Sequence, residues 1–380
     1  MARPFEVIMI ERNEILKAYG RDYKAMTLRL LEKAGLAEDL DLKRGGRDKA
    51  SFRVMLKPNL IACIPAKFGA TTHTELVEAV IEYLKDREYT NITIAEGSWV
   101  GDRTAEAYDI LGYNNIAKRY GVKIIDCQKD TSYEADCAGM KLHICSCYRD
   151  ADFLINMPVL KGHCQTRITC ALKNMKGLIP NSEKRRFHTM GLHKPIAHLN
   201  THIRQDFIII DHICGDPDFE EGGNPLVRNC VMAAKDPVLV DAYTAEILGY
   251  RPEDVSYIKL AESLGVGSAD TDSMRIITVE GENCEDLPDT HKIMQVSYAV
   301  EDIDSCSACY GMLIGALNRL SDEGLLAQLK DKVAIGQGYR GKTGSVGVGA
   351  CTRLFDYNIP GCPPSEEEIY EALKARITAD

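Results

Sequence analysis

Short apolar segments alternate with amphipathic segments along residues 53–279 of this 380-residue chain. Runs typical of strands occupy residues 53–57, 91–95, 122–126, 152–156, 207–211 and 275–279. Helical periodicity occupies residues 72–86, 104–111, 236–248 and 253–264. Strands that alternate with helices form a mostly parallel sheet with helices on both faces. The sequence therefore predicts an α/β fold with a mostly parallel sheet covered by helices.

Polar residues cluster at 280–295 and predict a domain boundary. We expect residues 1–290 to form the α/β domain and residues 291–380 to form a smaller α/β unit. The smaller unit has a strand pattern at 332–336 and a final helix at 365–377. In the larger domain, Thr72 and Glu75 have the spacing of a capping box, which predicts that a helix begins there.

Charge and hydropathy exclude several classes of protein. The net charge of −10 argues against a nucleic-acid partner, because nucleic-acid binders carry a basic footprint. No run of 18 apolar residues and no signal-peptide pattern is present, so we expect no membrane partner and a cytoplasmic location. The 14 cysteines predict thiols or metal ligands in a reducing compartment, and they suit an anaerobic host.

Four cysteines near the end of the chain have a metal-binding pattern: Cys306, Cys309, Cys351 and Cys362. The C-x-x-C spacing of the first pair lets two thiolates reach one centre, and the other two complete a four-ligand set. Such sets hold an iron–sulfur cluster or zinc. Glycines at 336–349 favour the cluster because their amides can approach its sulfurs. The remaining alternative is four unrelated thiols.

This segment resembles the cluster-binding part of the hydrogenase small subunit and of the related subunit of respiratory complex I. The resemblance lies in the C-x-x-C, the glycine-flanked Cys351 and the P-G-C-P-P loop at 360–364. It implies one [4Fe–4S] cluster with Cys306, Cys309, Cys351 and Cys362 as ligands, in a C-terminal iron–sulfur unit. A second metal site is a weaker alternative, at Cys127, Cys137, Cys145 and Cys147.

A basic segment at 161–194 contains eight lysines and arginines and one acidic residue. Such a local positive field focuses an anion into a cleft, and ligands bind at the carboxyl ends of strands in sheets of this type. Residues near predicted strand ends or in this segment are candidate anion ligands: Lys57, Asn59, Lys161, Lys173, Asn174 and Lys176. The run at 184–186 reads instead as a solvated face.

Three residues are candidates for catalysis. His163 is the candidate for proton transfer because imidazole titrates near neutral pH. Glu96 and Asp211 end predicted strands, and a carboxylate there is suited to acid–base work or to holding Mg²⁺. A phosphate-containing ligand is compatible with the lysines.

Residues 50–280 resemble the domain-of-unknown-function 362 family. The motifs are Lys57-Pro58-Asn59-Leu60, DFLINMPVLKGH at 152–163, ALKNMKGLIP at 171–180, Ile210-Asp211 and Asp236-Pro237-Val238 followed by Asp241. The resemblance implies the fold and an iron–sulfur segment, but no substrate.

Three functions fit these patterns. The first is a redox enzyme that binds an anionic substrate or cofactor in a Lys/His-lined cleft and uses one [4Fe–4S] cluster for electron transfer. The second is an electron carrier or maturation factor that acts on a redox partner protein. The third is a non-redox anion-binding protein with a structural metal. The G-x-G-x-x-G at 336–341 is a weak nicotinamide pattern, because further glycines follow where a helix should begin.

Overall fold

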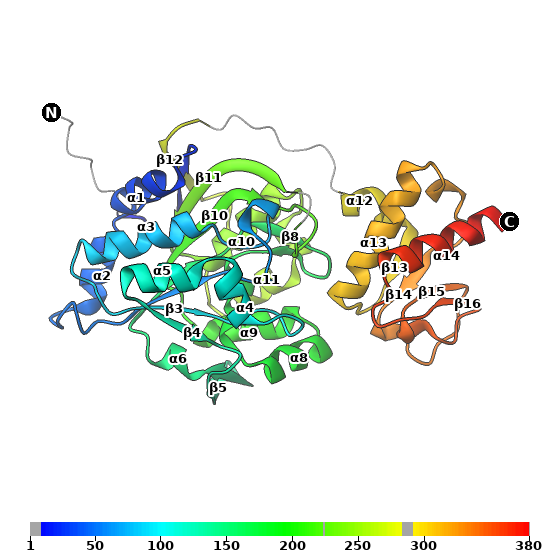
Figure 1. Ribbon diagram of the computed structural model, residues 1–380, viewed down its shortest axis with the longest axis horizontal. Helices are drawn as coiled ribbons and strands as arrows, with labels where there is room; N and C mark the ends of the chain where they lie inside the picture. Colours follow the sequence, from blue (N-terminus) through cyan, green and yellow to red (C-terminus); the bar gives the residue numbers. More distant parts are fainter. Residues whose placement is uncertain (1–8, 223–224, 283–291, 380) are drawn as a thin grey trace. The chain divides into compact units, whose positions relative to one another are not determined.

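The computed structural model describes residues 9–222, 225–282 and 292–379 (Figure 1). The chain divides into a larger unit, Met1–Gly162 with Thr166–Glu285, and a smaller unit, Asp286–Asp380 with His163–Gln165. The predicted boundary after residue 290 falls in 283–291, which lies outside the described residues. No described helix combines the length and apolar character needed to cross a bilayer.

An eight-stranded sheet forms the centre of the larger unit. In spatial order its strands are β12 (Arg275–Glu280), β1 (Glu14–Tyr19), β11 (Leu226–Ala234), β10 (Phe207–Gly215), β7 (Phe153–Met157), β2 (Val54–Pro58), β3 (Ile92–Glu96) and β4 (Lys123–Asp126). Only β11 runs antiparallel to its neighbours in this described sheet. The mostly parallel sheet is therefore confirmed, although β1 and β11 were not predicted.

Two short two-stranded sheets accompany the main sheet. They pair β5 (Ser132–Cys137) with β6 (Met140–Cys145), and β8 (Lys161–His163) with β9 (Arg167–Thr169).

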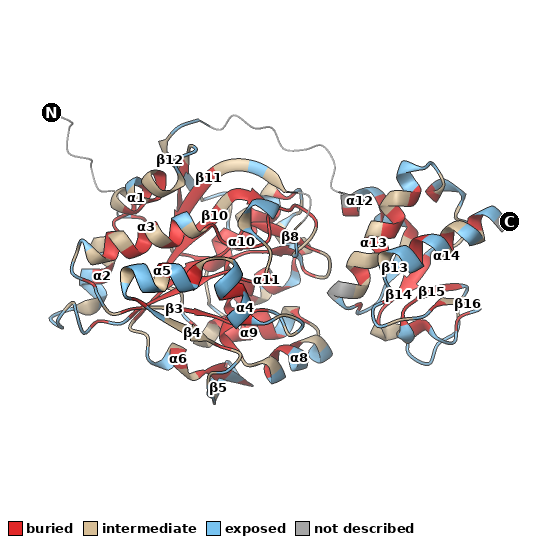
Figure 2. Ribbon diagram, in the orientation of Figure 1, coloured by how far each residue is buried: buried red, intermediate tan, exposed pale blue. Residues whose placement is uncertain are grey.

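Helices cover both faces of the main sheet, and buried side chains form a separate apolar core under each layer. Figure 2 shows in red the buried stretches of the strands and helices. One layer contains α1 (Tyr23–Ala34), α2 (Leu36–Arg44), α3 (Thr74–Lys85), α4 (Thr104–Ile110) and α5 (Tyr113–Tyr120). The other contains α6 (Ser146–Arg149), α7 (Ala171–Asn174), α8 (Asn181–Met190), α9 (His193–His202), α10 (Pro237–Ile247) and α11 (Ser256–Ser263). Strand β10 supplies both cores, because Ile208 faces one and Ile209 the other.

The predicted capping box at the start of α3 is wrong. The helix begins one residue after His73, and no side chain caps it. Thr72 lies outside the helix, where its Oγ1 accepts a hydrogen bond from the Asn59 amide at 2.8 Å and donates one to the Met157 carbonyl at 2.8 Å. These long-range bonds tie the ends of β2 and β7 to the segment before α3.

The smaller unit contains a four-stranded parallel sheet covered by helices. The strands, in both chain and spatial order, are β13 (Val300–Asp302), β14 (Val333–Ile335), β15 (Val346–Val348) and β16 (Tyr357–Ile359). Its helices are α12 (Lys292–Val296), α13 (Ser307–Asp322) and α14 (Glu366–Ala379). The predicted strand and final helix correspond to β14 and α14.

Asp241 in α10 joins helix α10 to the start of helix α7. Its carboxylate is buried and accepts hydrogen bonds from the Ala171 amide at 2.7 Å and the Leu172 amide at 3.3 Å. These amides begin a helix and have no partner within it, so the carboxylate acts as a distant cap. Burial raises the pKa of Asp241 to about 7.

We predict that Asp241→Ala lowers the free energy of unfolding by about 1–3 kcal/mol, because buried amides lose their acceptor. Asp241→Asn keeps an acceptor and is the matched control, with a smaller loss. A pKa raised in the folded state stabilises the protein at low pH and ceases to do so as pH rises through 7. The stability of wild type relative to Asp241→Asn should therefore fall between pH 4 and 7. Urea denaturation measures both effects, and equal losses in the two variants would contradict the capping role.

Candidate functional site

Polar side chains gather where strands β2, β3 and β7 end, at one edge of the main sheet. At the end of β2, Lys57 Nζ donates to the Pro58 carbonyl at 2.8 Å and forms an ion pair with Glu96, the last residue of β3. Both side chains are buried. A Cβ on Gly177 would lie 2.0 Å from Glu96 Oε1, so only glycine fits against this pair.

Amide side chains extend this network. Asn174 accepts a hydrogen bond from Asn59 Nδ2 at 2.9 Å and donates one to Asn156 Oδ1 at 2.7 Å. The ammonium of Lys161, fully buried, donates to Asn59 Oδ1 at 3.1 Å and to the Glu220 carbonyl at 2.8 Å. Because each buried polar group has a partner, the positions of Asn59 and Asn174 are fixed.

Two further lysines approach the same edge from α7 and α8. Lys173 donates to Thr169 Oγ1 at 2.9 Å and forms an ion pair with Glu220. Lys184 donates to the carbonyls of Gly97 at 2.8 Å and Ser98 at 2.7 Å. Its partners are neutral, so its charge is balanced only by more distant carboxylates.

These groups surround a cavity of about 60 Å³. The lining residues are Asn59, Ile61, Glu96, Gly97, Ser98, Trp99, Val100, Thr169, Lys173, Asn174, Lys176, Gly177, Lys184, His188 and Glu220. We call this cavity the lysine pocket. Two of its lining side chains, Lys176 and His188, make no hydrogen bond or ion pair with the described part of the chain. The cavity therefore lies beside side chains that can still form hydrogen bonds to a ligand.

Burial and neighbouring positive charges lower the pKa values of Lys176, Lys184 and His188 in the free pocket. Burial, together with Lys173, lowers the pKa of Lys176 to about 7. Burial, together with Lys176, lowers the pKa of His188 to about 4. Burial also lowers the pKa values of Lys161, to about 7, and of Lys184. An anion in the pocket would oppose these shifts by favouring the charged lysines.

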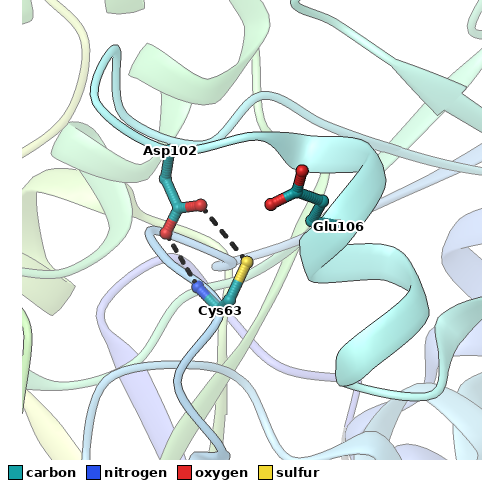
Figure 3. Close-up of side chains that lie close together, drawn as sticks. All are labelled: Cys63, Asp102 and Glu106. Carbon is teal, nitrogen blue, oxygen red and sulfur yellow. Dashed lines mark hydrogen bonds between the residues drawn. The ribbon is translucent and has the colours of Figure 1, made fainter.

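A loop carrying the chain's single tryptophan forms one rim of the pocket. The Trp99 amide donates to the Ile61 carbonyl at 3.1 Å. Next to it, Asp102 accepts hydrogen bonds from the Cys63 amide at 2.9 Å and from Cys63 Sγ at 3.2 Å (Figure 3). Cys63, Asp102 and Glu106 offer ligand atoms within 4.8 Å of one another, but Glu106 also pairs with Arg103 at 2.8 Å. These contacts fix the rim.

The predicted cleft residues fall into three groups according to their distance from the lysine pocket. Among them, the residues that line the lysine pocket are Asn59, Glu96, Lys173, Asn174 and Lys176. Lys57 and Lys161 lie behind it, bonded to lining residues. His163 and Asp211 are absent from its described lining. His163 accepts a hydrogen bond from the Gln165 amide at 3.0 Å, and Asp211 binds His73.

The sequence reasoning missed three titratable members of the pocket: Lys184, His188 and Glu220. The interpretation of 184–186 as a solvated face is wrong for Lys184, which is buried, and right for Arg185 and Arg186, which are exposed. Helical periodicity contained the signal. Lys184 lies three residues before the buried Phe187, so both belong to the inner face of α8.

A larger hollow of about 760 Å³ lies elsewhere in the larger unit. Its lining includes Arg12 and Asp236, which pair at 2.9 Å, and none of the predicted site residues. We therefore place the candidate site at the smaller cavity, where unpartnered polar groups converge.

In the smaller unit, three parallel strands deliver the four C-terminal cysteines to one edge of the sheet. Cys306 follows β13 and Cys309 lies in the first turn of α13. Cys351 follows β15 and Cys362 follows β16. Burial and the neighbouring thiols raise the pKa of Cys309 to about 11, which reflects their proximity.

The other predicted cysteine set is more scattered. Sγ of Cys127 lies 3.7 Å from Sγ of Cys147, and the Cys145 thiol donates to the Cys127 carbonyl at 3.3 Å. Cys137 instead faces the Ala135 carbonyl at 4.0 Å. Cys145 and Cys147 lie in different elements, because β6 ends at Cys145 and α6 begins at the next residue.

Together these features define an α/β protein with a buried lysine-rich pocket at the carboxyl edge of its sheet. Residues 54–246, just over half of the chain, match the model of the family described as domain of unknown function (DUF362). The chain belongs to this family. It is also similar to the thylakoid-associated protein sll1697 of Synechocystis sp., with 25% identity over 229 residues, which cover 57% of this chain and 70% of that protein.

We predict that Lys57→Met lowers the free energy of unfolding by about 3–5 kcal/mol, because Glu96 loses its buried partner. The double variant Lys57→Met/Glu96→Gln removes both charges and should recover most of this loss. Urea denaturation of the two single variants and the double variant gives the coupling energy. Simple additivity of the two single losses would contradict a tightly coupled pair.

Proposed function

We propose that this protein is an iron–sulfur redox protein whose larger unit binds an anionic substrate or cofactor in the lysine pocket. The observation that carries the anion site is the pair of unpartnered groups, Lys176 and His188, in a cavity surrounded by lysines. Lys176 is partly buried, and taking even part of an uncompensated ammonium out of water is costly. A bound anion supplies the missing charge and accepts the unused hydrogen bonds.

The balance of charge supports an anion rather than a cation. Lys57, Lys161, Lys173, Lys176 and Lys184 surround the site, and the ion-paired carboxylates are Glu96 and Glu220. A divalent cation would face more ammonium groups than carboxylates. The pocket volume of about 60 Å³ suits a small group such as phosphate, sulfate or carboxylate, either free or as the end of a larger ligand.

Sulfate is the sharpest probe because its charge is constant across the pH range of interest. We predict that sulfate binds to wild type and that Lys176→Met weakens the affinity at least about tenfold, as expected for a lost charge-assisted hydrogen bond. Isothermal titration calorimetry gives the affinity, and the fluorescence of Trp99, the single tryptophan, reports at the pocket rim. Lys259→Met, at an exposed position, is the matched control for charge.

Affinity for sulfate should also fall as pH rises from 6 to 9. With a pKa of about 7 in the free protein, Lys176 loses its charge over this range, and only the charged form binds the anion well. Lys176→Met should flatten this dependence. Equal affinities in wild type and Lys176→Met, or no binding at any pH, would contradict the anion site.

The iron–sulfur cluster of this proposal would be bound by the cysteines of the smaller unit. The C-x-x-C spacing, the glycines at 336–349 and the P-G-C-P-P loop at 360–364 support a four-iron cluster over a single ion. Cys306, Cys309, Cys351 and Cys362 would hold it, and the cluster would supply one-electron transfer.

We predict about four irons and four sulfides per chain after anaerobic purification, with an EPR signal after dithionite reduction. Cys362→Ala should lower the iron content and change the signal, whereas Cys230→Ala, at a buried position in β11, is the control. One zinc per chain, or the same metal content in wild type and Cys362→Ala, would contradict the cluster. Zinc would instead favour a non-redox anion-binding protein with a structural metal.

A further inference from the structure

A cysteine, a histidine and an aspartate lie in line beneath the surface of the larger unit. Sγ of Cys214 lies 3.9 Å from Nε2 of His73, and Nδ1 of the same imidazole lies 2.9 Å from Oδ2 of Asp211. Cys214 and Asp211 belong to β10, and His73 precedes α3. A nucleophile, a base and a group that orients the base have this arrangement in thiol chemistry.

The imidazole is fixed from several sides. Oδ2 of Asp211 accepts a second hydrogen bond from the His73 backbone amide at 2.7 Å, and its Oδ1 accepts one from the Ile213 amide at 3.1 Å. The ring of Tyr23 stands edge-on to the imidazole, with ring centroids 5.7 Å apart. Asp211 therefore holds Nδ1 and leaves Nε2 facing the sulfur.

Local electrostatics favour a proton on the imidazole. Burial disfavours the charged ring, but Asp211 and Cys214 outweigh this effect and raise the pKa of His73 to about 10. The titratable and charged groups around the pair are Asp211 and Tyr23, with Glu75 and Arg21 acting on Tyr23. An imidazolium beside a sulfur stabilises the thiolate, which is the nucleophilic form of cysteine. Cys214 Sγ also lies 3.2 Å from the Ala66 carbonyl, which accepts the thiol proton while the thiol is intact.

We propose that Cys214 is a nucleophilic thiol, activated by His73 and oriented through Asp211, that is modified by soft carbon electrophiles. Sγ attacks the electrophilic carbon and forms one S–C bond. The bond from that carbon to the leaving group breaks, and its electron pair departs with the leaving group. The thiol proton is released to solvent, and the imidazolium of His73 donates a hydrogen bond from Nε2 to the thiolate. This site is separate from the lysine pocket and does not depend on the proposed anion or cluster.

Cys63 provides an internal control in the same molecule (Figure 3). It is more exposed than Cys214, which is 3% exposed. Its neighbour is a carboxylate instead of an imidazole, and burial together with Asp102 raises the pKa of Cys63 to about 11. Exposure alone predicts that Cys63 reacts faster, whereas activation by His73 predicts that Cys214 reacts faster.

The experiment is site-resolved alkylation of the full-length native protein by iodoacetamide under anaerobic conditions, read by peptide mass spectrometry. At pH 7 we expect Cys214 to react at least about tenfold faster than Cys63. Between pH 6 and 8 the rate at Cys63 should rise about tenfold per unit, because its thiolate fraction does. The rate at Cys214 should rise less steeply than the rate at Cys63, because the neighbouring imidazolium stabilises the thiolate.

His73→Gln should slow alkylation at Cys214 at least about tenfold and leave Cys63 unchanged. The proposal is overturned if Cys63 reacts as fast as Cys214 in wild type, or if both rates rise in parallel with pH. It is also overturned if folded His73→Gln keeps the wild-type rate at Cys214. The two wild-type comparisons decide the matter even where the variant does not fold.

Discussion

The buried ion pair between Lys57 and Glu96 is the contact on which the candidate site depends. It joins the ends of adjacent strands β2 and β3, and Gly177 packs so closely on it that no side chain fits there. Burying these charges is offset only when both are present. Lys173 is also paired, with Glu220. Lys176 has no such partner among the described residues, and it lines the pocket beside these paired charges.

Both units place their reactive side chains where parallel strands end. In the larger unit these are the ends of β2 and β3, and in the smaller unit the ends of β13, β15 and β16. Parallel strands all finish at one edge, so residues distant in sequence meet there without a special connection. Lys57 and Glu96, 39 positions apart, form their ion pair for this reason.

Patterns of neighbouring residues predicted six strands of the main sheet (β2, β3, β4, β7, β10 and β12), helices α3, α4, α10 and α11, and several members of the site, because these depend on local periodicity. Contacts between distant segments did not follow from the sequence. Thr72 looked like a helix cap, yet it bonds Asn59 and Met157. Asp211 looked like a free carboxylate at a strand end, yet its partner is His73, 138 residues earlier. Strand β11 was missed because its antiparallel pairing depends on β1 and β10.

Burial acts in the same direction on every cationic group here, and the partner determines the outcome. Lys176 and His188 have no partner among the described residues, and burial lowers the pKa values of both. His73 is also buried, but Asp211 reverses the effect and raises its pKa. The positive charge of His73 is therefore stabilised by a residue of the protein itself, Asp211. The charge of the lysine pocket depends on what occupies it, so ligand binding there must be linked to proton uptake.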